Sequence, residues 1–219
     1  MPTRLHYSDM IDKLQRSVVE MGALVVKALR ESVRALIERD VDAAQEIVKK
    51  DEKINQLENE VVILATELIA EEQPVATDLR MILSSLRASH TLERIADNAV
   101  HISKSTILLV REGYLTPLKD LPRMASISIG MVEDALDVFV NPDVERAREI
   151  SNRDVSVDKI YKDIFRSLLD KMHEDPDKID QCMSLLFVCR RLERVADHAT
   201  HICEDSVYIE TGDHIDLNL

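Results

Sequence analysis

The sequence contains little of what strands, tight turns and disulfide-linked folds require. Its 219 residues include 4 Gly, 6 Pro, 3 Cys, no Trp and only 3% aromatic residues. Strands favour aromatic and β-branched residues and tight turns favour Gly and Pro, so this composition argues against a β-rich fold. The chain is instead 45% hydrophobic and 32% charged, which is typical of long amphipathic helices. We therefore predict an all-α protein.

Other absences limit the compartment and the partners. The longest apolar runs, such as 61–65, are much shorter than the roughly 20 residues of a membrane span, and 1–7 lacks the apolar segment of a secretory signal. A cytoplasmic protein without membrane insertion is expected. Its net charge of −13 disfavours nucleic acid and anionic lipid as partners. Cys182, Cys189 and Cys203 form no C-x-x-C pair and are expected to be small, core-facing residues.

Apolar residues at alternating steps of three and four predict three long helices in the first half. The first is expected to start at Ser8 as its N-cap, the second near Asp40, and the third to span about 76–110. Pro74 separates the second helix from the third, because proline is not tolerated inside a helix. Gly113 suits a C-terminal cap.

The same pattern begins again after the segment 113–122, whose two prolines and one glycine predict a connection. A shorter fourth helix is expected over about 124–138. Asn141-Pro142 is predicted to open a fifth helix as N-cap and first residue, and Asp175-Pro176 a sixth in the same way. The predicted domains are therefore 1–112 and 113–219.

An internal repeat relates the two halves. The segment 92–102, Leu-Glu-Arg-Ile-Ala-Asp-Asn-Ala-Val-His-Ile, returns as Leu-Glu-Arg-Val-Ala-Asp-His-Ala-Thr-His-Ile at 192–202. A fainter echo lies upstream, where the pair Asp51 and Asn55 corresponds to the pair Asp154 and Asp158. Duplication of a three-helix unit explains both. The predicted fold is two tandem, pseudo-symmetric, antiparallel three-helix bundles with six long helices in all.

The repeated motif places acids beside an apolar stripe. At 100° per residue, the core-facing stripe contains Leu92, Ala96, Ala99 and Ile102. Glu93, Asp97 and His101 follow one another along a flank outside this stripe. Glu193, Asp197 and His201 repeat this flank in the second half. Carboxylates at i and i+4 repel each other, so a repeated pair needs an explanation.

Three explanations are open. The first is a solvated charged face with arginine counter-ions, for which Arg94, Arg190, Arg194 and Arg87 are candidates. The second is a surface cation site, in which carboxylate oxygens, with or without a histidine nitrogen, bind a divalent or trivalent metal. The third is an inward-facing di-iron site, but its Glu-x-x-His signature is missing because alanine stands three residues after each glutamate. No phosphate loop, nucleophile elbow or catalytic triad is visible, so no catalytic residue is predicted.

At this point the chain resembles the PhoU family of bacterial phosphate-signalling regulators over nearly its whole length. The resemblance rests on four segments: 73–80 (Gln-Pro-Val-Ala-Thr-Asp-Leu-Arg), 92–97, 192–197 and 201–204 (His-Ile-Cys-Glu). It implies paired three-helix bundles with metal ions held on their surface by Glu/Asp-x-x-x-Asp motifs. The metal could be iron, zinc, manganese or magnesium. The candidate metal-binding residues are Glu93, Asp97, Glu193, Asp197, Asp51, Asn55, Asp154, Asp158, His101 and His201.

The resemblance also implies a function. PhoU proteins are negative regulators of the phosphate-starvation response, linking a Pst-type phosphate ABC transporter, through its ATPase subunit, to a PhoR-type sensor histidine kinase. A non-enzymatic, homodimeric adaptor is expected, with any dimer contact away from the acidic flank. The alternatives are a metal-dependent carboxylate enzyme, a metal-storage protein, or a helical spacer similar to spectrin repeats, which would need no repeated acidic motif.

Overall fold

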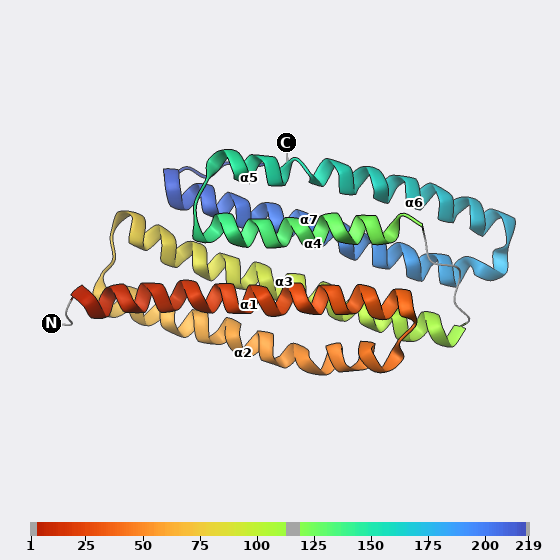
Figure 1. Ribbon diagram of the computed structural model, residues 1–219, viewed down its shortest axis with the longest axis horizontal. Helices are drawn as coiled ribbons and strands as arrows, with labels where there is room; N and C mark the ends of the chain where they lie inside the picture. Colours follow the sequence, from red (N-terminus) through yellow and green to blue (C-terminus); the bar gives the residue numbers. More distant parts are fainter. Residues whose placement is uncertain (1–3, 113–118, 218–219) are drawn as a thin grey trace.

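The computed structural model describes residues 4–112 and 119–217, and within them every regular element is helical. Two bundles lie side by side along their length (Figure 1). The first contains α1 (Arg4–Glu38), α2 (Val41–Glu72) and α3 (Ala76–Glu112). The second contains α4 (Leu121–Val140), α5 (Val144–Ser151), α6 (Asp154–Glu174), the short 3₁₀ helix η1 (Pro176–Lys178) and α7 (Ile179–Thr211). The predicted all-α fold of two three-helix units is confirmed.

Three details differ from the sequence prediction. Ser8 lies inside α1 rather than at its N-cap. The predicted fifth helix is divided into α5 and α6 by a turn at Asn152 and Arg153. Its N-cap is Asp143, whose side chain accepts a hydrogen bond from the Arg146 backbone N–H at 3.0 Å, so Pro142 precedes the cap. A side-chain oxygen that can reach the third backbone N–H decides the start of this helix over the neighbouring proline.

Other boundaries agree with the prediction. Asp40 caps α2 by accepting a hydrogen bond from the Ala43 backbone N–H at 2.9 Å. Pro74 lies in the break between α2 and α3. Asp175-Pro176, in contrast, opens the 3₁₀ helix η1, and α7 begins three residues later than predicted, at Ile179. Gly113 and most of the predicted connection lie outside the described residues.

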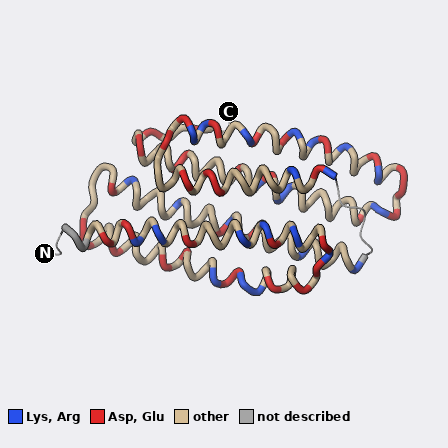
Figure 2. Tube along the Cα trace, in the orientation of Figure 1, with Lys and Arg blue, Asp and Glu red and all other residues tan. Residues whose placement is uncertain are grey.

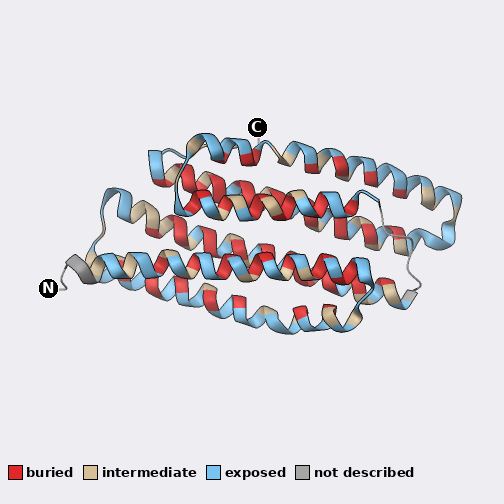
Figure 3. Cartoon of the chain, viewed as in Figure 1, coloured by how far each residue is buried: buried red, intermediate tan, exposed pale blue. Residues whose placement is uncertain are grey.

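A single hydrophobic core runs through both bundles (Figure 3). The most extensive helix contact joins α3 to α7, which are antiparallel. Small residues of the repeated motif, including Ala96 and Ala196, are buried and allow close packing. Leu92, Ala99 and Ile102 are buried as predicted, and so are the three cysteines. Gly22 lets α1 approach α4, since a Cβ there would lie 2.5 Å from a methyl carbon of Leu136.

Candidate functional site

The acidic flank of the first bundle gathers carboxylates from two helices. Burial, followed by repulsion from Asp97, raises the pKa of the Asp51 carboxyl. Burial, followed by repulsion from Asp97 and Glu58, raises the pKa of Glu93. The α2 acid therefore faces the α3 motif as the sequence predicted. We call Asp51, Glu58, Glu93 and Asp97 the first cluster.

Glu58 is a member that the sequence did not reveal. Its Oε1 lies 3.1 Å from the Nδ1 of His90, which stands three residues before Glu93 on α3. A helix wheel of α2 alone would have shown that Glu58 lies two turns beyond Asp51 on a similar face. The second half has Tyr161 near the matching place, so comparison of the repeats did not select this glutamate.

The second bundle contains the matching cluster, formed by Asp154 and Asp158 of α6 with Glu193 and Asp197 of α7. Burial and repulsion from Asp197 raise the pKa of Glu193 to about 7. Burial, with repulsion from Asp197 and Asp158, raises the pKa of Asp154 to about 6. Burial is also the main reason for the raised pKa of Asp197. We call these four acids the second cluster.

Glu193 departs from the prediction of a fully outward-facing flank. It is only 8% exposed, because it lies at the seam between α6 and α7. Arg190, one turn earlier, forms an ion pair with its Oε1. Its other oxygen, Oε2, is buried without a hydrogen-bond partner, and so is Oδ1 of Asp154. Buried carboxylate oxygens are normally satisfied, so two unpaired ones within one cluster indicate a place for a positively charged group.

The remaining candidate ligands are less closely engaged. Asn55 is exposed, and its backbone carbonyl accepts a hydrogen bond from Asn59. Burial lowers the pKa of the His101 imidazole, and the nearby Asp97 carboxylate opposes this shift. Burial raises the pKa of the Asp197 carboxyl, and the nearby His201 opposes that shift. Within the described residues, no three Asp, Glu, His or Cys side chains already converge as a complete metal site. A bound ion would therefore have to draw the carboxylates of a cluster together.

The chemistry of the two clusters nevertheless suits a hard cation. Carboxylate oxygens are the preferred ligands of Mg²⁺, Ca²⁺ and Mn²⁺. The raised pKa values of Glu193 and Asp154 show that their negative charges are poorly compensated by the protein. Figure 2 shows acidic and basic residues interspersed along the long helices.

Glu193→Gln is expected to stabilise the metal-free protein at pH 8 and to change little at pH 5. The folded-state pKa of about 7 lies above the ordinary 4.5, so the folded protein is penalised above pH 7 and the penalty fades as the pH falls toward 4.5. The gain at pH 8 should be roughly 1–2 kcal/mol. Thermal unfolding with a chelator measures it, with exposed Glu210→Gln as control. An equal gain at both pH values would contradict the assignment.

Comparison with known proteins identifies the family. The PhoU domain matches residues 18–106 and again 121–206, once in each bundle. The chain belongs to the PhoU family. It is 36% identical over 217 residues to the phosphate-specific transport system accessory protein PhoU homolog of Clostridium acetobutylicum, covering 99% of both chains. The corresponding Rhizobium meliloti homolog is 35% identical and covers 94% of this chain and 87% of its own.

Solved PhoU structures share the fold as well. The crystal structure of PhoU from Pseudomonas aeruginosa matches with a TM-score of 0.90 and 33% identity, covering 94% of this chain and all of that one. PhoU from Streptococcus pneumoniae matches with a TM-score of 0.87 and 28% identity, covering 96% and 99% of the two chains. In this PhoU-family chain, none of the described helices is long and apolar enough to span a bilayer.

Proposed function

We propose that this protein is a cytoplasmic adaptor and negative regulator of phosphate uptake and the phosphate-starvation response. The observation that carries the proposal is the end-to-end relationship to the Clostridium acetobutylicum protein, named as an accessory of the phosphate-specific transport system. Two long helical bundles packed side by side present extended surfaces on which other proteins can dock. The adaptor links the ATPase subunit of the phosphate transporter to a sensor histidine kinase and catalyses no reaction itself.

Cations at the acidic clusters are part of this proposal. Asp154, Asp158, Glu193 and Asp197 would hold one ion, and the first cluster would hold another. A divalent or trivalent ion would offset the repulsion among four carboxylates and satisfy the unpaired oxygens of Asp154 and Glu193. Ligation by His101, His201 or Asn55, and assembly into a homodimer, stay predictions.

Deletion of the gene is expected to switch on phosphate-starvation genes in cells grown at high phosphate. The physical reason is that the transporter would no longer be connected to the kinase, so the kinase would receive no signal of sufficiency. A transcriptional reporter of the starvation response measures the effect, and expression of the intact chain from a plasmid should restore repression. Normal repression in the deletion strain would exclude the regulatory role.

Affinity capture from a membrane extract tests the physical link separately. The tagged protein should retain the transporter ATPase subunit and the kinase. The matched control is a tagged helical protein of similar net charge, because an acidic chain of net charge −13 attracts basic proteins unspecifically. If neither partner is captured although deletion of the gene switches on the starvation genes, the protein must regulate the response indirectly.

A further inference from the structure

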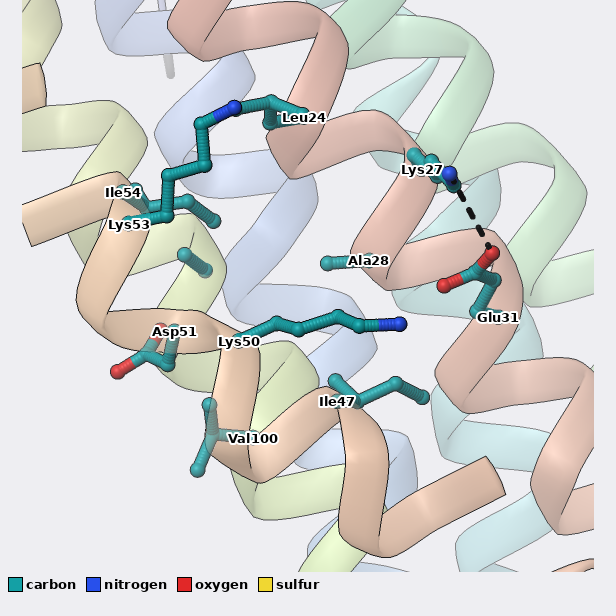
Figure 4. A pocket seen from close by; sticks show the side chains of 11 residues that line it. Leu24, Lys27, Ala28, Glu31, Ile47, Lys50, Asp51, Lys53, Ile54 and Val100 are labelled. Carbon is teal, nitrogen blue, oxygen red and sulfur yellow. Dashed lines mark ion pairs between the residues drawn. The ribbon is translucent and has the colours of Figure 1, made fainter. Parts of the chain in front are cut away.

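A small cavity opens between the three helices of the first bundle, next to the first cluster (Figure 4). Its volume is about 140 Å³. The floor is apolar and includes Leu24, Ala28, Ile47, Ile54 and Val100. Charged side chains from α1 and α2 surround its mouth, namely Lys27, Glu31, Lys50, Asp51 and Lys53. It therefore combines an apolar body with a charged entrance, as small-molecule sites commonly do.

The second bundle fills the corresponding space. Aligning Val18 with Leu121 and Leu36 with Phe139 superimposes the buried positions of α1 on those of α4. This alignment places Met131, which is fully buried, at the position of Ala28. The first bundle therefore has a cavity because Ala28 has only a methyl group where the second bundle has the larger side chain of Met131.

The residue that corresponds to Lys50 in the second bundle is an arginine with a partner on the neighbouring helix. The helix starts at Asp40 and Asp143 correspond, which places Arg153 at the position of Lys50. Arg153 forms an ion pair with Asp134 on α4. It passes so close to Gly130 that a Cβ there would lie 2.8 Å from its Nη2. The Arg153 guanidinium is therefore paired across the helices with an acid of α4.

Lys50 has no such partner on α1. Its Nζ lies 3.9 Å from Oε2 of Glu46, an acid that Lys49 already contacts at 3.1 Å. In Figure 4 the Lys50 side chain extends across the cavity toward α1, while the Asp51 carboxylate turns the other way.

The other charges at the mouth leave a surplus of positive charge. The Nζ of Lys27 and Oε1 of Glu31 face each other at 4.0 Å. Lys53 forms no ion pair with the described residues. The Asp51 carboxylate, which turns away from Lys50 in Figure 4, does not form an ion pair with it. Lys53, and Lys50 with only the long contact to the shared Glu46, thus bring two ammonium groups to the cavity.

We propose that this cavity binds a small organic monoanion, with its apolar body on the floor between α1, α2 and α3 and its carboxylate at Lys50. An apolar cavity of about 150 Å³ in another protein accommodates benzene, so the space here suits a body of benzene size. The carboxylate would gain a charge-assisted hydrogen bond from an ammonium group already present at the entrance. The proposal is independent of the regulatory role, since it rests only on the cavity and its charges.

Titration with benzoate, followed by NMR of methyl-labelled protein, tests the site. Saturable shifts are expected at the methyl groups of Leu24, Ile47, Ile54 and Val100, fitting one dissociation constant. Ala28→Met should abolish them, because it installs the side chain that fills the second bundle. Its thermal unfolding should remain cooperative, because the second bundle already accommodates methionine at this position. No saturable shift up to 10 mM benzoate, or unchanged shifts in Ala28→Met, would overturn the proposal.

Lys50→Gln separates an anion site from a merely apolar cavity. It should weaken benzoate binding about tenfold, the usual worth of a charge-assisted hydrogen bond at a partly exposed site, and leave the binding of toluene unchanged. Lys49→Gln, a neighbour outside the cavity, should leave both unchanged. Equal benzoate affinity in Lys50→Gln and in the unaltered protein would refute recognition of the carboxylate.

Discussion

Replacing three acids of the second cluster with alanine, in Asp154→Ala/Glu193→Ala/Asp197→Ala, should weaken Mn²⁺ binding at that cluster at least 100-fold. These residues supply most of the carboxylate oxygens, including the two that lack a hydrogen-bond partner. Calorimetric titration of chelator-treated protein measures the loss as the disappearance of the tighter of two binding events. Mutation of ligand-supporting groups alone typically costs 10–100-fold, and loss of the ligands themselves should cost more.

The same variant should unfold at a higher temperature than the unaltered protein when no metal is present. Burial and mutual repulsion raise the pKa values of Glu193 and Asp154 to about 7 and about 6, so their charges oppose folding at neutral pH. The triple variant should therefore be more stable than the unaltered protein without metal, and it should gain no stability at this cluster when metal is added. A merely structural role for these acids would give destabilisation in both conditions.

A charge-matched control excludes a general effect of net charge. Asp163→Ala/Asp170→Ala/Asp180→Ala also removes three carboxylates from α6 and α7, and all three are exposed outside the cluster. This control should bind Mn²⁺ as the unaltered protein does. Equal affinity in the cluster variant and the control would remove the second cluster as a metal site.

The first cluster should bind more weakly than the second. Asn55, which is exposed, stands where the second cluster has Asp158, and the fourth acid of the first cluster, Glu58, already contacts His90 at 3.1 Å. An amide oxygen carries no formal charge, so the cation gains less from it than from a carboxylate. Glu193 is buried, whereas its counterpart Glu93 is only half-buried, so water screens the first cluster more strongly. The sequence already indicated unequal sites through Asn55, and burial adds a second reason.

The fold was largely predictable because helix periodicity and the repeat both indicate the same architecture. Every long helix was expected from its apolar spacing, and the buried motif residues Leu92 and Ile102 lie as the wheel placed them. The break between α5 and α6 was not predicted, since Asn152 and Arg153 carry no proline or glycine signal. The spacing of apolar residues continues through the turn, so only the packing of α5 and α6 against α7 and α4 reveals the break.

The candidate site was predictable in membership but not in environment. A wheel assigns Glu193 to a flank, yet burial depends on how closely α6 approaches and on the Arg190 side chain that covers it. Arg87 was considered as a counter-ion for the acidic motif, but the structure pairs it with Asp205 on α7. Such pairs depend on the register between α3 and α7, which no single helix pattern specifies.

The second large effect is expected from the ion pair between Arg87 and Asp205. Arg87→Ala should reduce the free energy of unfolding by about 2–3 kcal/mol at pH 8. The Nε of Arg87 lies 2.6 Å from Oδ1 of Asp205, which is only 7% exposed, and the guanidinium also lies 4.8 Å from the ring centre of Tyr208. Removing the guanidinium leaves a buried carboxylate without its counter-charge at the contact between the two bundles. Because the Arg87 side chain is 42% exposed, the loss should be smaller than for a fully buried pair.

The pH dependence of this loss distinguishes the ion pair from simple packing. Burial already raises the pKa of Asp205 to about 6 against the opposing effect of Arg87, and removal of Arg87 should raise it further. An acid with a raised folded-state pKa destabilises the protein most above that pKa, and below it the penalty no longer depends on how far the pKa is raised, so the proteins with and without Arg87 should converge. Chemical denaturation of Arg87→Ala should therefore show a much smaller deficit at pH 5 than at pH 8. A deficit of equal size at both would mean that the arginine acts only through packing.

The repeat itself supplies the control for this experiment. Phe187 corresponds to Arg87, and Ser105 corresponds to Asp205, so the repeat offers an uncharged pair of residues for these two positions. The double variant Arg87→Phe/Asp205→Ser installs that pair and removes the buried carboxylate together with its partner. Its stability should return to within about 1 kcal/mol of the unaltered protein and lose the extra pH dependence, because no buried charge remains uncompensated. If the double variant were as unstable as Arg87→Ala, the guanidinium would be needed for contacts other than Asp205, with Tyr208 as the first to test.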